Sequence, residues 1–169
     1  MSEEERKMNR KPRTRARRER VKPEFDQKII SMRRVTRVVA GGRRFSFSVA
    51  LVAGDRKGRV GVGVGKATDT PLAIDKAMRD AKKNMITVNA TKDMSVPHET
   101  EAKYAASVVK IRPLPGRGVL AGSSVRTVLE LAGLRGIGAK LLSRSKNSAN
   151  NACAAVKALE KLAGTKIRK

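Results

Sequence analysis

Alternating apolar and polar residues predict strands in the first third of the chain. Residues 30–40 are rich in β-branched side chains and alternate in polarity, and Gly41 and Gly42 end this run. In residues 44–52, every second side chain is apolar from Phe45 onward. Alternation with a period of two is typical of a strand that buries one of its faces. Two strands separated by the glycine pair are therefore predicted.

A third strand and a helix complete the first predicted unit. The turn at residues 54–58 leads into residues 59–66, so the second and third strands are predicted to form a hairpin. Thr70 is the predicted N-cap of the next helix, and Pro71 suits its first position. The apolar residues at helical spacing, which would cover the sheet, are Ile74, Ala77, Met78, Ala81, Met85 and Val88. Residues 24–90 are thus predicted to be a small α+β unit of three strands and one helix.

A polar stretch at residues 91–97 is predicted to be the linker to a second unit, residues 98–169. The predicted elements of that unit are, in order, a strand at residues 105–114, a glycine-rich loop at 115–122, a helix capped by Ser123 or Ser124 and ended by Gly133, a strand at 137–142 and a helix at 147–163. The order is β-α-β-α. The whole chain is therefore predicted to be an α+β protein of two small domains.

Charge is the strongest compositional signal. The 169 residues include 39 Lys and Arg against 15 Asp and Glu, which gives a formal net charge of +24. A body with this much like charge repels itself and is best accommodated against a polyanion, either nucleic acid or an acidic membrane. No apolar run is long enough to span a bilayer, and the first residues lack the pattern of a signal peptide. We therefore expect nucleic acid, and no membrane, as the partner.

Residues 1–23 are predicted to be a basic arm that is disordered in isolation. Basic residues are dense from Arg6 to Lys22, where Glu19 is the one acidic residue, and apolar periodicity is missing. Such a block cannot bury enough apolar surface to offset its chain entropy. We expect Arg13, Arg15, Arg17 and Arg18 to bind RNA.

Metal and cofactor chemistry is not expected. One cysteine, Cys153, and one histidine, His98, cannot assemble a zinc site of nitrogen and sulfur ligands within one chain, and a lone cysteine cannot form an intrachain disulfide. Aromatic residues are scarce, so recognition should run mainly through phosphates and shape. Phe45 and Phe47 lie on the face that also carries Val49, so we predict that both are core residues rather than base-stacking ones.

Two glycine-rich motifs invite a nucleotide-binding interpretation. Residues 61–66 fail the phosphate-loop spacing, because Val60 and Ala67 stand where Gly and Ser or Thr are needed. Glycines on one face of a strand instead favour the close approach of another backbone. Residues 115–124 resemble the phosphate loop of GHMP-type kinases, but backbone amides at a helix start attract an RNA phosphate as well as ATP. No acid–base pair stands out nearby, so no catalytic residue is predicted.

The order of glycines, hairpin turn and helix in residues 41–86 resembles that of the bacterial ribosomal protein S5 family. The resemblance continues through residues 96–99 and 118–133 and covers about residues 25–162. It implies an N-terminal domain related to double-stranded-RNA-binding domains and a C-terminal domain with the fold of GHMP kinases. It also implies binding to small-subunit ribosomal RNA between body and head, to the fourth and eighth small-subunit proteins, and to messenger RNA near the entry region, with an influence on decoding accuracy.

We therefore predict a non-catalytic RNA clamp that is cytoplasmic and lies in the ribosome. The predicted RNA-binding residues are Arg13, Arg15, Arg17, Arg18, Arg37, Gly41, Gly42, Arg43, Arg44, Arg56, Lys57, Arg59, Lys66, Arg117, Ser123 and Ser124. The resemblance places Arg126 on a helix that faces the fourth small-subunit protein. Two alternatives stay open, a small-molecule kinase of GHMP type and a free regulator that binds double-stranded RNA.

Overall fold

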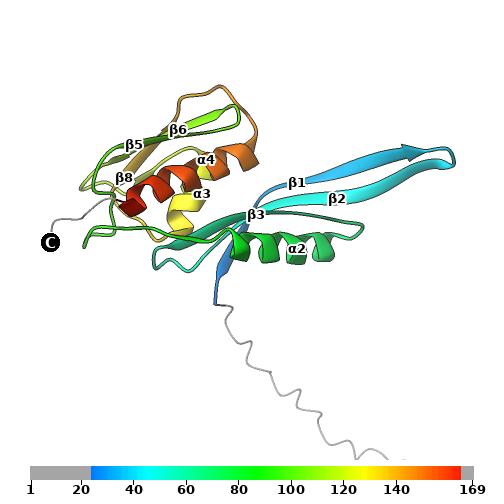
Figure 1. The fold of residues 1–169 in the computed structure, drawn as a ribbon, viewed down its shortest axis with the longest axis horizontal. Coiled ribbons are helices and arrows are strands. Elements are labelled where there is room, and N and C mark those ends of the chain that lie inside the picture. The colour runs from blue at the N-terminus through cyan, green and yellow to red at the C-terminus, as the bar shows by residue number, and fades with distance from the viewer. Residues whose placement is uncertain (1–23, 165–169) are drawn as a thin grey trace, which may run out of the picture.

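The computed structural model describes residues 24–164 and builds two four-stranded sheets with three helices in that range (Figure 1). The elements are β1 (Asp26–Val39), β2 (Gly42–Gly54), β3 (Arg59–Ala67), α2 (Thr70–Lys83), β4 (Ile86–Thr87), β5 (Thr100–Tyr104), β6 (Ser107–Pro113), β7 (Val119–Leu120), α3 (Ser123–Leu131), β8 (Ile137–Leu141), α4 (Ser148–Glu160) and a 3-10 turn (Lys161–Gly164). The predicted arm, with Arg13, Arg15, Arg17 and Arg18, lies outside the described residues.

The first sheet has the order β1-β2-β3-β4, and all of its neighbours are antiparallel. The predicted hairpin between β2 and β3 is confirmed. Strands β1 and β2 form a second hairpin, in which Val39 pairs with Gly42 across a two-residue turn. These strands have 14 and 13 residues, far more than the usual five or six. Figure 1 shows that they project as a ribbon well beyond the rest of the sheet.

Helix α2 packs so closely on β3 that the two backbones are in contact. A Cβ added to Gly61, Gly63 or Gly65 would collide with the backbone of α2. The facing residues of the helix are the buried Ala73, Ala77 and Ala81. Alanines four residues apart are separated by about 6 Å along a helix axis, and glycines two residues apart are separated by roughly 6.6 Å along a strand. The row of alanines on α2 therefore matches the row of glycines on β3. The prediction that this glycine motif serves close backbone approach is confirmed, and the backbone is that of α2.

The second sheet has the order β5-β6-β8-β7, with β7 and β8 parallel. Helices α3 and α4 lie between this sheet and the first one, as Figure 1 shows. One core therefore spans both predicted units: Val52, Val60 and Val62 of the first sheet belong to the same buried cluster as Val128 of α3 and Leu159 of α4. The layers run sheet, α3 and α4, sheet, α2.

The first unit contains four strands, not the three that were predicted. Helix α2 ends at Lys83, so Met85 and Val88 follow the helix instead of extending its apolar face. Thr87 pairs with Arg59, and the Val88 N–H donates to the Gly58 carbonyl at 2.8 Å. The β-branched run at residues 86–88 favours this short edge strand over another helical turn. The N-cap of α2 is Asp69, one residue before the predicted Thr70.

The second unit has two strands that the sequence did not predict, β5 and β7. The predicted strand at residues 105–114 begins at Ser107, because Ala105 and Ala106 form the turn between β5 and β6. The N-cap of α3 is Gly122, so the predicted caps Ser123 and Ser124 lie inside the first helical turn. The predicted end of this helix at Gly133 is confirmed: Gly133 follows the C-cap with φ +77°.

We predict that Gly63→Ala destabilises the fold by about 2–3 kcal/mol, because its Cβ would force α2 away from β3. Gly118→Ala is the matched control, since a Cβ there meets nothing within 4 Å and its φ is not positive. It should change stability by about 0.5 kcal/mol at most. Urea unfolding measures both variants, and a Gly63→Ala protein of unchanged stability would contradict the close packing.

Candidate nucleic-acid interface

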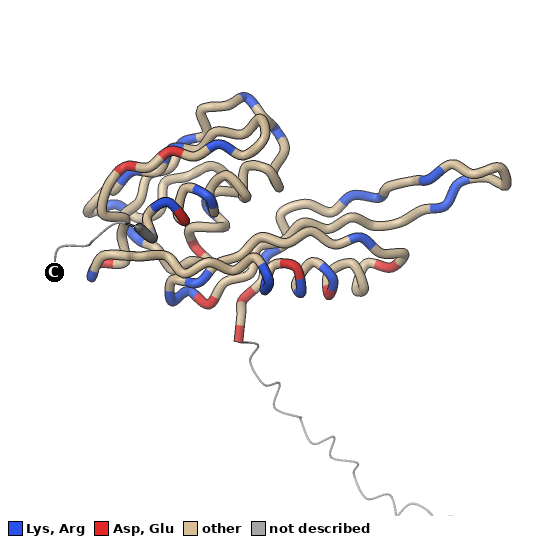
Figure 2. Tube along the Cα trace, in the orientation of Figure 1, with Lys and Arg blue, Asp and Glu red and all other residues tan. Residues whose placement is uncertain are grey.

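The outer part of the β1–β2 hairpin, residues 31–48, has no buried residue, and we call it the distal hairpin. Its charged residues are Arg33, Arg34, Arg37, Arg43 and Arg44. No Asp or Glu occurs between Asp26 and Asp55. Figure 2 shows this ribbon marked by basic residues alone, whereas α2 carries both signs. An exposed projection of one sign of charge attracts a polyanion.

Pairing sorts the distal hairpin into two faces, because residues opposite each other across an antiparallel ladder project to the same side. The arginine face carries Arg33, Arg37 and Arg44, with Arg37 directly opposite Arg44. Lys66 of β3 continues this face, since it pairs with Ser48, which in turn pairs with Arg33. Like charges that face each other directly destabilise a sheet. The pair formed by Arg37 and Arg44 is therefore a place where a bound anion would relieve repulsion.

The tip of the hairpin brings several predicted residues together. Arg37 pairs with Arg44 and Val38 pairs with Arg43, so these three arginines lie beside one another just before the turn that contains Gly41. Gly42 has φ +123°, which residues other than glycine rarely adopt. A Cβ at either glycine would meet nothing within 4 Å, so the backbone of the tip is open to a ligand.

The opposite side of the distal hairpin, which we call the aromatic face, corrects one prediction. Phe47 is half-buried and packs against the cluster of Val49 and Ala73, as expected. Phe45 is 47% exposed and lies outside the core, contrary to prediction. The reason is that β2 extends beyond α2, so the helix covers this face only as far as Phe47. The Arg34 guanidinium carbon lies 4.6 Å from the centre of the Phe45 ring.

A second group of predicted residues lies at the other end of β2, in the β2–β3 turn. Its charges are largely balanced within the protein: Arg59 Nε lies 2.7 Å from Asp55 Oδ2, and Arg56 Nε lies 2.9 Å from Asp26 Oδ2. Arg59 Nη2 also lies 3.5 Å from Glu24 Oε1. Lys57 has no ion pair among the described residues. These arginines are thus less available to an external phosphate than those of the distal hairpin.

The backbone of the β2–β3 turn is anchored to the end of α3. The Arg56 N–H donates to the Leu131 carbonyl at 2.9 Å, and the Gly58 N–H donates to the Ala132 carbonyl at 3.0 Å. A Cβ at Gly54 or Gly133 would collide with the facing backbone, so the approach requires glycine at both positions. Hydrogen bonds between segments so distant in sequence leave no local pattern, and sequence reasoning missed this junction.

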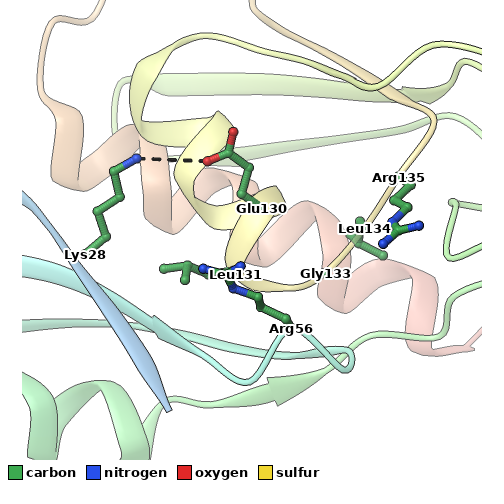
Figure 3. A pocket seen from close by; sticks show the side chains of 7 residues that line it. All are labelled: Lys28, Arg56, Glu130, Leu131, Gly133, Leu134 and Arg135. Atoms are coloured by element: carbon green, nitrogen blue, oxygen red, sulfur yellow. Dashed lines mark ion pairs between the residues drawn. The ribbon is translucent and has the colours of Figure 1, made fainter. Parts of the chain in front are cut away.

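Beside this junction lies a cleft of about 380 Å3 with three basic side chains in its lining. Figure 3 shows Lys28, Arg56 and Arg135 around it, together with Glu130. The Lys28 ammonium lies 3.9 Å from the Glu130 carboxylate, marked by the dashed line. Glu130 also accepts a hydrogen bond from Arg126 Nε at 2.7 Å. The cleft is of mixed charge and is a weaker anion site than the distal hairpin.

Of the predicted phosphate contacts in residues 115–124, the structure brings only the two serines together. Ser124 is buried, with 4% exposure, while Ser123 is exposed beside Lys28 and Arg126. Arg117 is exposed in the loop but does not line the cleft that contains the two serines. Ser123 is therefore the better candidate of the two for contact with a phosphate.

Other kinds of site find no support in the described part of the chain. Between residues 24 and 164, no three His, Cys, Asp or Glu side chains gather to hold a metal ion. None of the helices in this range combines the length and apolar character needed to cross a membrane. Burial raises the pKa of the Cys153 thiol, so it is not an activated nucleophile.

Comparison with known proteins gives one family match for each of the two predicted units. The model of "Ribosomal protein S5, N-terminal domain" matches residues 25–89, and that of "Ribosomal protein S5, C-terminal domain" matches residues 102–166. The small ribosomal subunit protein uS5c of Rhodomonas salina is 50% identical over 140 residues, which are 82% of this chain and 83% of that protein. The uS5 protein of Synechococcus elongatus is 47% identical over 82% of this chain and 77% of its own length. The uS5c protein of Spinacia oleracea is 45% identical over 87% of this chain and 48% of its own length.

We predict that Asp55→Asn lowers stability by about 2 kcal/mol at neutral pH, because the amide has no negative charge and has one acceptor oxygen in place of two for the three surrounding N–H donors. The side chain of Asp55 is 7% exposed. Burial alone would raise its pKa, but hydrogen bonds from the Arg59 side chain and from the Lys57 and Arg59 N–H groups hold that pKa below the usual value. A carboxylate with a lowered pKa stabilises the fold fully above the unfolded-state pKa of about 3.9. This contribution is lost progressively as the pH falls from there through the lower folded-state pKa.

Urea unfolding at pH 7, 5 and 3 measures this difference. The gap between the wild-type protein and Asp55→Asn should be full at pH 7 and should shrink at pH 3. Asp75→Asn, at an exposed position of α2, is the control and should stay within about 0.5 kcal/mol of wild type. A gap that is equal at every pH would contradict a role for the carboxylate charge.

Proposed function

Because the chain belongs to the ribosomal protein S5 family, and is thus a non-enzymatic constituent of the small ribosomal subunit, we propose that it binds small-subunit ribosomal RNA mainly through the distal hairpin. In this proposal Arg37, Arg43 and Arg44 neutralise phosphates at the tip. Displaced counterions supply much of the binding free energy, which makes the affinity depend on salt.

One observation carries the proposal: Arg37 faces Arg44 on an exposed ribbon that has no carboxylate of its own. Placing two guanidinium groups opposite each other is unfavourable in the free protein. A phosphate between them would turn this repulsion into two charge-assisted hydrogen bonds, which guanidinium groups form with good geometry. The open glycine backbone at Gly41 and Gly42 would let the RNA approach closely.

The junction residues have a different part in this proposal. Arg56 and Arg59 are held by Asp26 and Asp55, so we assign them first to the structure of the turn and only second to RNA. Lys57, Lys66, Arg117 and Ser123 are exposed and remain proposed phosphate contacts. Ser124 is not proposed, because it is buried. The four arginines of the N-terminal arm remain proposed contacts on the grounds of composition alone.

Finer features follow from the family resemblance and are proposed on that basis. The first unit would be related to double-stranded-RNA-binding domains, and the second would have the fold of GHMP kinases without kinase activity. The protein would bridge body and head of the subunit, lie near the messenger RNA entry region and influence decoding accuracy. The fourth and eighth small-subunit proteins would be its protein partners. The exposed position of Arg126 on α3 supports the contact with the fourth small-subunit protein. Arg126 lies beside the cleft that Ser123 and Ser124 line, which is distinct from the cleft of Figure 3.

We predict that the triple variant Arg37→Gln, Arg43→Gln, Arg44→Gln weakens binding to small-subunit ribosomal RNA and lowers the salt dependence. Removing one phosphate interaction should reduce the slope of log affinity against log salt by about 0.7–0.9, so the loss of three should reduce it by about two to three. Filter binding or fluorescence anisotropy between about 50 and 200 mM salt, a range over which phosphate-dominated affinity falls steeply, measures it.

The matched control removes the same charge elsewhere. Lys103, Arg112 and Lys140 are exposed on the outer face of the second sheet, and their change to Gln should alter the slope much less. Equal slopes for the two triple variants would mean that total charge alone governs binding. That result would contradict the assignment of the interface to the distal hairpin.

We predict that the chain sediments with small ribosomal subunits in a sucrose gradient of a cell extract and that ribonuclease treatment releases it. A constituent of the particle is held by many RNA contacts and travels with it. A free regulator that binds double-stranded RNA would instead stay near the top of the gradient. The second result would contradict the ribosomal role.

A further inference from the structure

We propose that Arg34 and Phe45 form a stacking platform for one unpaired base of the bound RNA. This inference rests on the proposed function and adds a second kind of contact, on the aromatic face of the distal hairpin. The two residues are diagonal neighbours across the ladder, because Phe45 pairs with Thr36 and Arg34 pairs with Phe47. Diagonal neighbours lie within reach of aromatic and long side chains.

The platform is open because nothing in residues 24–164 covers it. Phe45 is 47% exposed, and the nearby Met32 and Val38 are 55% and 75% exposed. All three project from the aromatic face, on the side of the sheet where α2 packs closer to the core. Apolar surface gathered beside arginines on a projecting element is more typical of an interface than scattered single residues are.

The contact between the two side chains explains how they would act together. With its carbon 4.6 Å from the ring centre, the Arg34 guanidinium lies against Phe45 and is held there by the ring. Arg34 itself is exposed, so the group remains accessible. Unpaired RNA bases stack both on aromatic rings and on guanidinium planes. A base would add to this pair as a third layer or rest on the free part of the ring.

Charge favours an RNA base over a protein side chain as the occupant. Six basic residues and no acidic residue lie between Asp26 and Asp55, so any partner on either face meets a strongly positive field. An apolar protein segment would have to bring carboxylates to balance this charge. An unpaired nucleotide brings its own phosphate and a planar base in one unit, and the arginine face can bind the flanking backbone.

The two faces can be told apart by their salt dependence. Removing a phosphate interaction lowers the salt slope, whereas removing a stacking interaction lowers affinity at every salt concentration and leaves the slope unchanged. For full-length protein and transcribed small-subunit ribosomal RNA, Phe45→Leu should weaken binding by about tenfold, the effect expected for one stacked base. Phe45→Trp keeps an aromatic plane and should stay within about twofold of wild type.

Arg34→Lys and Arg33→Lys are a matched pair, since both keep the charge and the two residues lie on opposite faces of the same strand. Lysine has no plane on which a base can stack. The loss of affinity should therefore be at least about fivefold larger for Arg34→Lys than for Arg33→Lys. Chemical probing of the RNA gives a second readout: Phe45→Leu should expose a small number of unpaired nucleotides that the wild-type protein protects.

The outcomes separate the two proposals. If wild-type protein does not bind the RNA, the proposed function fails, and this inference fails with it. If wild type binds with its salt slope but Phe45→Leu binds equally well, the stacking platform alone is overturned. Equal losses for Phe45→Leu and Phe45→Trp would also overturn it. So would full RNA affinity of Phe45→Leu combined with loss of incorporation into subunits, which would identify a protein as the occupant.

Discussion

Strand β2 is buried on both faces over its inner half, which we call its root, and the rest of the structure depends on this buried segment. Residues 49–54 are all buried, because α2 covers one face and the layer of α3 and α4 covers the other. An isolated two-stranded ribbon is marginally stable at best in water. Fixed at its root, the outer half of β2 can extend by roughly 20 Å as a projection, at about 3.3 Å per residue. The position of the distal hairpin is thus a consequence of core packing in the body.

The β2–β3 turn makes that body a single unit. Its backbone hydrogen bonds to Leu131 and Ala132, together with the core shared by both sheets, join segments that the sequence divides into two domains. The carboxylates of Asp26 and Asp55 hold the arginines of this turn in place. The basic residues of the chain therefore serve two purposes. Those at the junction form ion pairs within the protein, and those of the distal hairpin have no such partners among the described residues.

Periodicity, together with the positions of glycines, was enough to predict the hairpin of β2 and β3, the presence of helix α2, the close approach along Gly61 to Gly65, and the end of the next helix at Gly133. It was not enough to predict how far each element covers its neighbour. Phe45 and Phe47 have the same place in the alternating pattern, yet only Phe47 lies under α2. The composition likewise gives the number of arginines but not which of them form ion pairs, so Arg59 and Arg44 looked equivalent in the sequence. Short edge strands such as β4 depend on partners far away in the sequence, and local patterns do not record those partners.

The two faces of the distal hairpin answer different requirements of RNA binding. Phosphate contacts give affinity for any polyanion and carry no information about which RNA is bound. A protein with a net charge of +24 has such affinity in excess, so further arginines would add little selectivity. A platform that accepts a base can be used only where a nucleotide is unpaired, which depends on the fold of the RNA. Combining both on one projecting ribbon therefore restricts a strong but indiscriminate attraction to sites of the right shape.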